Sequence, residues 1–157
     1  MLALAGVAVA AHAFQFAVIS DGSYSSNTGI SNEQVVGQTG IEELDTLVLD
    51  YATETGEYTG PGGNLDFTFT WGPPGQGYPY GDGNYYQGVW TYANTSTGDF
   101  ANMNGGGTFA FGINNGDGNG NYHSNTALVG SLVTVPEPAA FAALGIGLVA
   151  LVRRRRK

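Results

Sequence analysis

Leu65-Asp66-Phe67-Thr68-Phe69-Thr70-Trp71 places a large apolar side chain at every odd position, with Asp or Thr between them. Neighbouring side chains of a β-strand point to opposite faces, so this alternation predicts a strand with one buried face and one solvated face. Stretches rich in β-branched and aromatic residues predict five more strands. They cover residues 14–20, 46–52, 88–93, 108–113 and 126–135.

Segments rich in Gly and Asn separate the predicted strands, at 60–64, 72–83, 102–107 and 114–121. Both residue types accept the positive φ angles that tight turns need. Residues 21–45 predict a long polar loop or an edge strand around 34–36, and no segment predicts the crossover helices of a parallel sheet. We therefore expect an all-β fold, a single antiparallel β-sandwich or jelly-roll-like domain with Gly/Asn-rich loops.

The same alternation selects the residues that should fill the core. Burying one large apolar side chain contributes about 1.5–3 kcal/mol, so a dozen of them can support a small all-β domain. The predicted core residues are Phe16, Val18, Leu47, Leu49, Leu65, Phe67, Phe69, Trp90, Phe109, Phe111, Leu128 and Leu132.

The chain separates its positive charges from its negative ones. All 5 Lys and Arg lie at 153–157, whereas all but one of the 13 Asp and Glu lie at 14–135. We therefore expect no side-chain ion pair within 14–135, and we exclude nucleic-acid binding there because phosphate contacts need cations. The absence of cysteine excludes disulfides, thiol catalysis and zinc–thiolate sites.

The C-terminal end combines three features in a fixed order. Val135-Pro136-Glu137-Pro138 precedes an uncharged apolar run at 139–152, and a basic end follows. Proline is tolerated in the first turn of a helix, so the run predicts a short hydrophobic helix with its cations on the cytoplasmic side of a membrane. Its length of about 21 Å is less than the ~30 Å hydrocarbon core, which favours a temporary anchor. The basic end consists of Arg153, Arg154, Arg155, Arg156 and Lys157.

These C-terminal features together resemble the PEP-CTERM sorting signal of bacterial exported proteins, with an ordinary tail anchor as the alternative. The resemblance implies that Val135, Pro136, Glu137 and Pro138 form the sorting motif for an exosortase-type processing enzyme. It also implies transient anchoring in the inner membrane and delivery to the cell surface or extracellular matrix of a Gram-negative-type bacterium. The implied context is exopolysaccharide or biofilm matrix.

The N-terminal end predicts a signal peptide at 1–13. Residues 2–11 are small and apolar, and Ala11-His12-Ala13 fits the small-x-small pattern of signal peptidase cleavage. No Lys or Arg precedes the apolar stretch, so either the true start lies upstream or Met1 is internal. The alternative is a first strand or helix of the domain. We therefore expect an exported domain at 14–135, between a signal peptide and a sorting signal at 136–157.

The run at 114–121 offers a weak candidate for calcium. Asp117, Asn119 and Asn121 space three oxygen ligands as an EF-hand loop does, but Tyr122 replaces the expected glycine and Leu128 replaces the final carboxylate. The loop is therefore not an EF-hand. A flexible hairpin loop is the alternative interpretation.

Aromatic and polar residues between 71 and 92 suggest a carbohydrate-binding loop. Aromatic faces can stack on sugar rings, while carboxylate and amide groups bind hydroxyls. The alternative is that these aromatics pack the loop against its sheet. The candidate glycan contacts are Tyr78, Tyr80, Asp82, Tyr85, Tyr86 and Trp90.

No motif supports an enzymatic activity. The chain has no G-x-S-x-G, no H-E-x-x-H and no phosphate-binding glycine loop, and nothing in the spacing selects catalytic partners for His123. We therefore expect a non-catalytic exported protein without a firm cofactor. Its alternative function is carbohydrate binding through residues 78–90, with extracellular polysaccharide as the partner.

Overall fold

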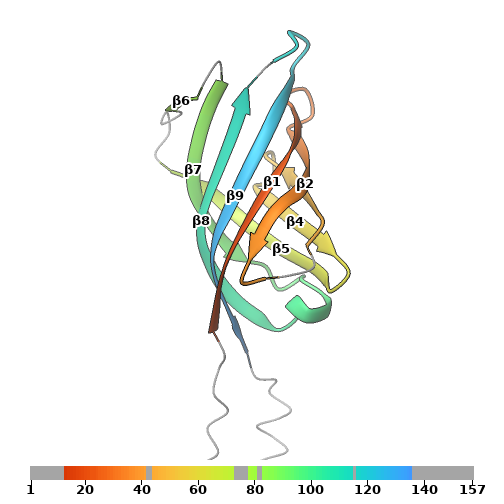
Figure 1. Cartoon of the computed structure of the whole chain (residues 1–157), viewed down its shortest axis with the longest axis vertical. Helices are drawn as coiled ribbons and strands as arrows, with labels where there is room; N and C mark the ends of the chain where they lie inside the picture. Colours follow the sequence, from red (N-terminus) through yellow and green to blue (C-terminus); the bar gives the residue numbers. More distant parts are fainter. Residues whose placement is uncertain (1–12, 42–43, 73–77, 81–82, 115, 136–157) are drawn as a thin grey trace, which may run out of the picture.

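The computed structural model describes residues 13–41, 44–72, 78–80, 83–114 and 116–135. The regular elements in these ranges are antiparallel β-strands and one short 3-10 helix (Figure 1). In chain order, the elements are β1 (Ala13–Ser25), β2 (Ile30–Thr39), β3 (Thr46–Asp50), β4 (Thr55–Gly60), β5 (Gly63–Trp71), β6 (Tyr78–Tyr80), β7 (Gly83–Tyr92), η1 (Gly98–Phe100), β8 (Met103–Asn114) and β9 (Asn121–Thr134). All six predicted strands are confirmed as strands.

The sheet closes into a barrel, so the predicted sandwich or jelly roll is wrong. The strand order is β5-β4-β3-β2-β1-β9-β8-β7-β6, and an additional pairing of β5 with β7 completes the ring. The strand β6 pairs with β7 beyond the end of β5 and lies outside the closed ring of eight. A sandwich would leave edge strands, whereas here β1 pairs with β9 along its whole length, from Ala13–Val133 to Ser25–Asn121.

Successive strands run in opposite directions, which gives the barrel two distinct ends. The lower end in Figure 1 holds the start of β1 and the end of β9, where both ends of the chain leave the barrel side by side. It also holds the β2–β3, β4–β5 and β7–β8 connections. The upper end holds the β1–β2, β3–β4, β6–β7 and β8–β9 connections.

All the predicted core residues are buried inside the barrel, which confirms the core predicted from the alternation. A closed barrel of eight strands is just wide enough for side chains to fill its interior. Four further residues join this core: Ile41, Leu44, Tyr58 and Phe100.

The predicted turn at 102–107 is wrong, because Gly105, Gly106 and Gly107 lie within β8. Gly107 is needed there because the Trp90 indole lies close against the barrel wall. A Cβ on Gly107 would lie 2.0 Å from the Val129 carbonyl oxygen and 2.8 Å from the Trp90 Nε1 atom. Gly107 therefore makes room for a large ring within regular strand structure.

The polar stretch 21–45 is also more regular than predicted. It contains the end of β1 and all of β2, a full strand of the ring. The inward positions of β2 include Ser31 and Glu33, which are polar yet buried, so apolar alternation could not reveal the strand. The predicted hydrophobic helix at 139–152 and most of the predicted signal peptide lie outside the described residues.

Candidate functional site

Inward-facing aromatic side chains gather at the upper end of the barrel. Tyr24 lies near the end of β1, Tyr51 directly follows β3 and Trp71 ends β5; Tyr86 and Phe111 lie in β7 and β8. Phe111 is buried, and the other four are half-buried. We name these five residues the aromatic mouth. The mouths of β-barrels are among the places where ligand sites occur.

Tyr51 lies at the centre of the aromatic mouth. Its ring stacks on Trp71 at a centroid distance of 5.6 Å and an interplanar angle of 10°, and it lies 4.8 Å from the Phe111 ring. Tyr24 meets Tyr51 edge to face at 5.1 Å, and Tyr86 meets Trp71 in the same way at 5.8 Å. These offset and edge contacts fix the orientation of the rings.

The phenol of Tyr51 adds a polar group to this apolar site. Burial raises the pKa of Tyr51 above its ordinary value, and the nearby Glu33 carboxylate raises it further. The phenol therefore stays neutral at physiological pH and keeps its proton as a hydrogen-bond donor. Its hydroxyl oxygen has no hydrogen-bond partner among the described residues. The aromatic mouth thus combines stacked rings with one buried, neutral hydroxyl.

Of the predicted glycan contacts whose side chains the structure describes, one lies in the core. Trp90 is 1% exposed and donates its indole N–H to the Val129 carbonyl oxygen at 3.1 Å, so its prediction as a glycan contact is wrong: the ring lies in the core. Tyr86 belongs to the aromatic mouth, and Tyr85 is half-buried. Tyr78 and Tyr80 belong to β6, which pairs with β7, and Asp82 lies outside the described residues.

Two residues of the aromatic mouth, Tyr24 and Tyr51, were not among the residues predicted for the core or for a site. Both continue an alternating pattern beyond the last strong apolar residue of their strand. Tyr24 follows the inward positions of Phe16, Val18 and Ser20 in β1, and Tyr51 follows those of β3. The alternation of inward positions therefore extends to both tyrosines, but polar residues within the two segments made it hard to recognise.

The structure places Asp117 and Asn119 in the β8–β9 connection and Asn121 at the start of β9, as expected for a hairpin. The Asp117 carboxylate accepts the backbone N–H groups of Asn119 and Asn121 at 2.7 and 3.1 Å, and the Asn121 side-chain amide at 2.8 Å. The hydrogen bond from the Asn121 amide, followed by those from the backbone, lowers the pKa of Asp117. The loop thus uses this carboxylate to hold its own shape, and the calcium site stays a prediction.

One ion pair departs from the expected absence of such pairs. His123 Nε2 lies 2.9 Å from Asp21 Oδ1, with the two side chains 43% and 46% exposed. The pair becomes an ion pair when the imidazole is protonated. The described residues contain no group of three or more His, Asp or Glu that could hold a metal ion. These observations leave the expected lack of catalytic activity a prediction.

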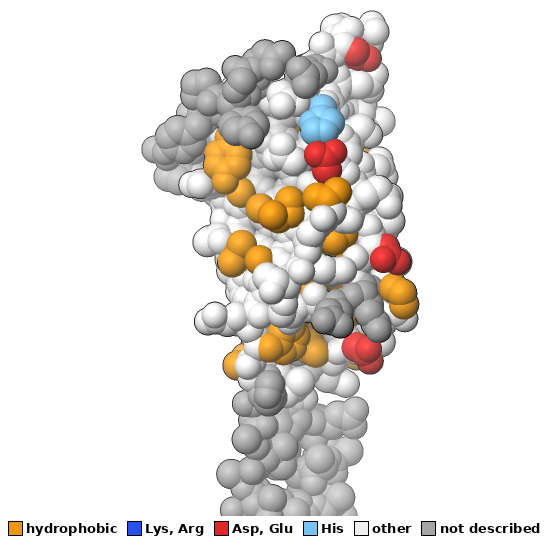
Figure 2. Space-filling model, in the orientation of Figure 1, with side chains coloured by type: hydrophobic (Ala, Val, Ile, Leu, Met, Phe, Trp, Pro, Cys, Tyr) orange, Lys and Arg blue, Asp and Glu red, His pale blue; other side chains and the backbone are white. Residues whose placement is uncertain are grey.

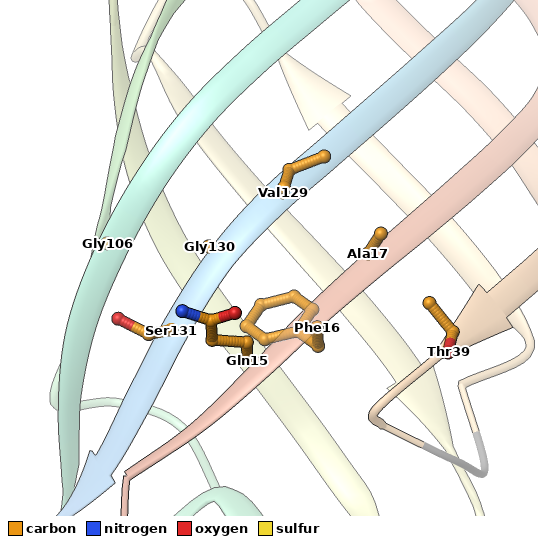
Figure 3. A pocket seen from close by; sticks show the side chains of 8 residues that line it. All are labelled: Gln15, Phe16, Ala17, Thr39, Gly106, Val129, Gly130 and Ser131. Atoms are coloured by element: carbon orange, nitrogen blue, oxygen red, sulfur yellow. The ribbon is translucent and has the colours of Figure 1, made fainter.

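The outer wall of the barrel carries a shallow hollow near the lower end of β1 and β9 (Figure 3). Gly106 and Gly130 give it a floor without side chains. Val129 is 48% exposed, and Ile19 on the adjacent strand β1 and Val89 on β7, two strands away, are similarly exposed. Figure 2 shows hydrophobic side chains on this face among uncharged polar ones and a few Asp and Glu side chains, and no Lys or Arg among the described side chains. The hollow is lined by Gln15, Phe16, Ala17, Thr39, Gly106, Val129, Gly130 and Ser131.

The barrel passes directly into the C-terminal region. The strand β9 ends at Thr134, and the Val135 backbone N–H donates to the Asn102 carbonyl oxygen at 2.8 Å. Among the described residues, no helix has the length and apolar character needed to cross a membrane. The sorting motif Pro136-Glu137-Pro138, the apolar run 139–152 and the basic end lie beyond the described residues.

Of the comparisons with known proteins, only the one with protein families gives a match. No curated protein and no solved structure matches the chain. Residues 134–157 match the family model described as the PEP-CTERM protein-sorting motif. This motif implies a bacterial exported protein that is made as a membrane-anchored precursor and processed by an exosortase. The predicted resemblance is therefore confirmed: the C-terminal region of this chain is a PEP-CTERM sorting motif.

Proposed function

We propose that this chain is a non-catalytic component of the bacterial cell surface or of an exopolysaccharide-rich biofilm matrix. The observation that carries the proposal is the sorting motif at 134–157, which begins where β9 ends. The sorting machinery then receives a folded barrel followed by a short recognition segment. After processing, the mature protein loses the basic end, which contains every Lys and Arg of the chain.

The charge of the remaining domain supports a matrix role. Residues 14–135 carry Asp and Glu but no Lys or Arg. Outside the cell, such a surface repels other acidic polymers at low salt and attracts divalent cations, which can bridge it to acidic polysaccharide. The uncharged hollow of the outer wall and the aromatic mouth provide areas where this repulsion is weakest.

Mass spectrometry of the protein isolated from its own host tests the sorting step. We expect a mature chain that lacks residues 153–157, and an unprocessed chain in a host without the exosortase. In the variant Glu137→Gln, processing should slow, whereas Glu57→Gln on the exposed face of β4 should be processed normally. A C-terminus ending in Lys157 in the mature wild-type protein would disprove the proposed processing.

A second candidate function is glycan binding at the aromatic mouth. The half-buried and mutually packed rings of Tyr51, Trp71 and Tyr86 support it. Affinity electrophoresis in gels that contain the host's exopolysaccharide tests this function. Retardation of the wild type that is lost in Trp71→Ala, and kept in the exposed-wall control Val89→Ala, would support it. Equal migration with and without polysaccharide would exclude it.

A further inference from the structure

A group of oxygen-bearing side chains lies inside the barrel, below the aromatic mouth. We name it the interior oxygen cluster and define it as five residues on three adjacent strands. They are Ser20 of β1, Ser31 and Glu33 of β2, and Ser124 and Thr126 of β9. None is more than 2% exposed. Core positions of a small barrel are normally apolar, so a cluster of this size requires an explanation.

Two serine hydroxyls contact the Glu33 carboxylate of the interior oxygen cluster. Ser20 Oγ donates to one oxygen of Glu33 at 2.8 Å, and Ser31 Oγ lies 2.8 Å from the other. Ser31 Oγ also lies 2.9 Å from Ser124 Oγ. An ionised carboxylate has about four lone-pair sites, so these two hydroxyls leave part of its acceptor capacity unused.

When ionised, the Glu33 carboxylate has no side-chain counter-charge inside the barrel. Residues 14–135 contain no Lys or Arg, and their one histidine, His123, lies on the outer wall beside Asp21. A buried carboxylate without a positive partner is costly, because desolvation of the charge is not compensated. The hydroxyls reduce this cost but bring no charge.

Further oxygen atoms of this interior lack partners or have only weak ones. Thr126 is 1% exposed and lies directly opposite Ser20 in the β1–β9 pairing, yet its Oγ1 has no hydrogen-bond partner among the described residues. The Tyr51 hydroxyl is also without one, and the Tyr58 hydroxyl makes only a 3.5 Å contact with Ser20 Oγ. Orphaned buried hydroxyls beside an unneutralised carboxylate indicate that a ligand belongs among them.

We propose that the interior oxygen cluster binds a small monovalent cation, such as Na⁺, with Glu33 as its charged ligand. Hard cations prefer carboxylate, carbonyl and hydroxyl oxygens, the chemistry that the cluster offers. A single carboxylate balances one positive charge, whereas calcium sites gain affinity from several carboxylates. A water molecule could satisfy the orphaned hydroxyls, but it would not neutralise the charge. The cation therefore accounts for both features together, independently of the proposed surface function.

Thermal unfolding of the full chain at constant ionic strength tests the proposal, with NaCl compared with tetramethylammonium chloride. The bulky organic cation screens surface charge equally but cannot enter the interior. We expect a melting temperature about 3 °C or more higher in NaCl, because a ligand that binds only the folded state stabilises it. In Glu33→Gln this difference should disappear, whereas the exposed control Glu57→Gln should keep it.

A second variant keeps the test decisive where Glu33→Gln fails to fold. Thr126→Val preserves the shape of the side chain but removes the orphaned hydroxyl. If Thr126 Oγ1 is a ligand, the NaCl-dependent shift should fall to about half or less of its wild-type value. Equal melting temperatures of the wild type in the two salts would overturn the proposal. A shift that persists unchanged in Glu33→Gln or Thr126→Val would also overturn it.

Discussion

Gln15 of β1 lies directly opposite Ser131 of β9, so strands from the two ends of the domain are neighbours in the sheet. This pairing joins the first strand to the last, and together with the pairing of β5 with β7 it leaves the ring without an exposed edge. Open sheets often protect their edges with lysine, which discourages pairing with other chains. Residues 14–135 contain no lysine, and closure supplies this protection by geometry.

Cysteines introduced at these two positions should therefore form a disulfide. Directly opposite residues of antiparallel strands have Cα atoms about 4.5–5.5 Å apart, within the range that a disulfide requires. The chain has no other cysteine that could compete. For Gln15→Cys/Ser131→Cys, we expect an oxidised form about 2–4 kcal/mol more stable than the reduced form in chemical denaturation. Failure to oxidise, in a variant that is folded, would contradict the closure of the barrel.

Replacement of Gly130 by alanine should destabilise the barrel. A Cβ at this position would lie 2.4 Å from the Gly106 carbonyl oxygen and 2.6 Å from the Trp90 ring. Overpacking of this kind typically costs about 1–3 kcal/mol, which a denaturation midpoint measures. Gly37→Ala is the matched control, because no atom lies within 4 Å of the Cβ there. Equal stabilities of the two variants would show that the Trp90 ring is not packed against this wall.

The alternation of apolar residues predicted the core of this protein but not its closure. Phe67, Phe69 and Phe109 face inward in a sandwich and in a barrel alike, so their pattern identified the buried face correctly. The difference between the two folds depends on which strands pair. The pairing of β1 with β9 joins residues from the two ends of the domain, and no local pattern encodes it.

The interior oxygen cluster was harder to predict than the core, because its residues depart from the apolar pattern of the core. Ser20, Ser31 and Glu33 occupy inward positions where alternation calls for apolar residues. The pattern of residues 21–45 therefore predicted a polar loop or an edge strand in this region. Trp90 shows the opposite error: it was correctly predicted in the core, but aromatic side chains beside polar ones also suggested a glycan contact there.

Ser96 should stabilise the β7–β8 connection at the lower end of the barrel. Its Oγ accepts the Asp66 backbone N–H at 2.8 Å and donates to the Ala93 carbonyl oxygen at 2.9 Å. Ser96→Ala leaves buried backbone groups of this connection without these bonds, at a cost of about 1–3 kcal/mol in the free energy of unfolding. Thr95→Ala, at an exposed neighbouring position, should change it by less than about 0.5 kcal/mol. Equal effects would mean that Ser96 does not hold the connection.

Alkaline pH should unfold the protein through its buried tyrosines. Burial raises the pKa of both Tyr51 and Tyr58 above the ordinary value of 10.0. Above that pH the unfolded chain loses protons that the folded chain retains, so the free energy of unfolding falls as pH rises; below it the contribution is fully present. We expect melting temperatures to fall above pH 10 and to fall less in Tyr51→Phe. Tyrosinate absorbance from all tyrosines before unfolding would contradict this burial.

Acid should weaken the β8–β9 connection through Asp117. Its pKa is lowered below 3.8 by hydrogen bonds, so its contribution to stability is fully present above pH 3.8 and is lost as pH falls through the lowered value. Asp117→Asn should remove this part of the acid dependence, as seen in melting temperatures across the acid range, whereas Asp99→Asn in the exposed first turn of η1 should not.

Calorimetric titration with calcium completes the test of this loop. The Asp117 carboxylate already accepts three hydrogen bonds, from Asn119 and from Asn121, which leave about one of its four lone-pair sites for a cation. We therefore expect the wild type and Asp117→Asn to give the same heat of calcium addition. Heat that appears in the wild type and is lost in Asp117→Asn would instead establish the calcium site predicted from the spacing of Asp117, Asn119 and Asn121.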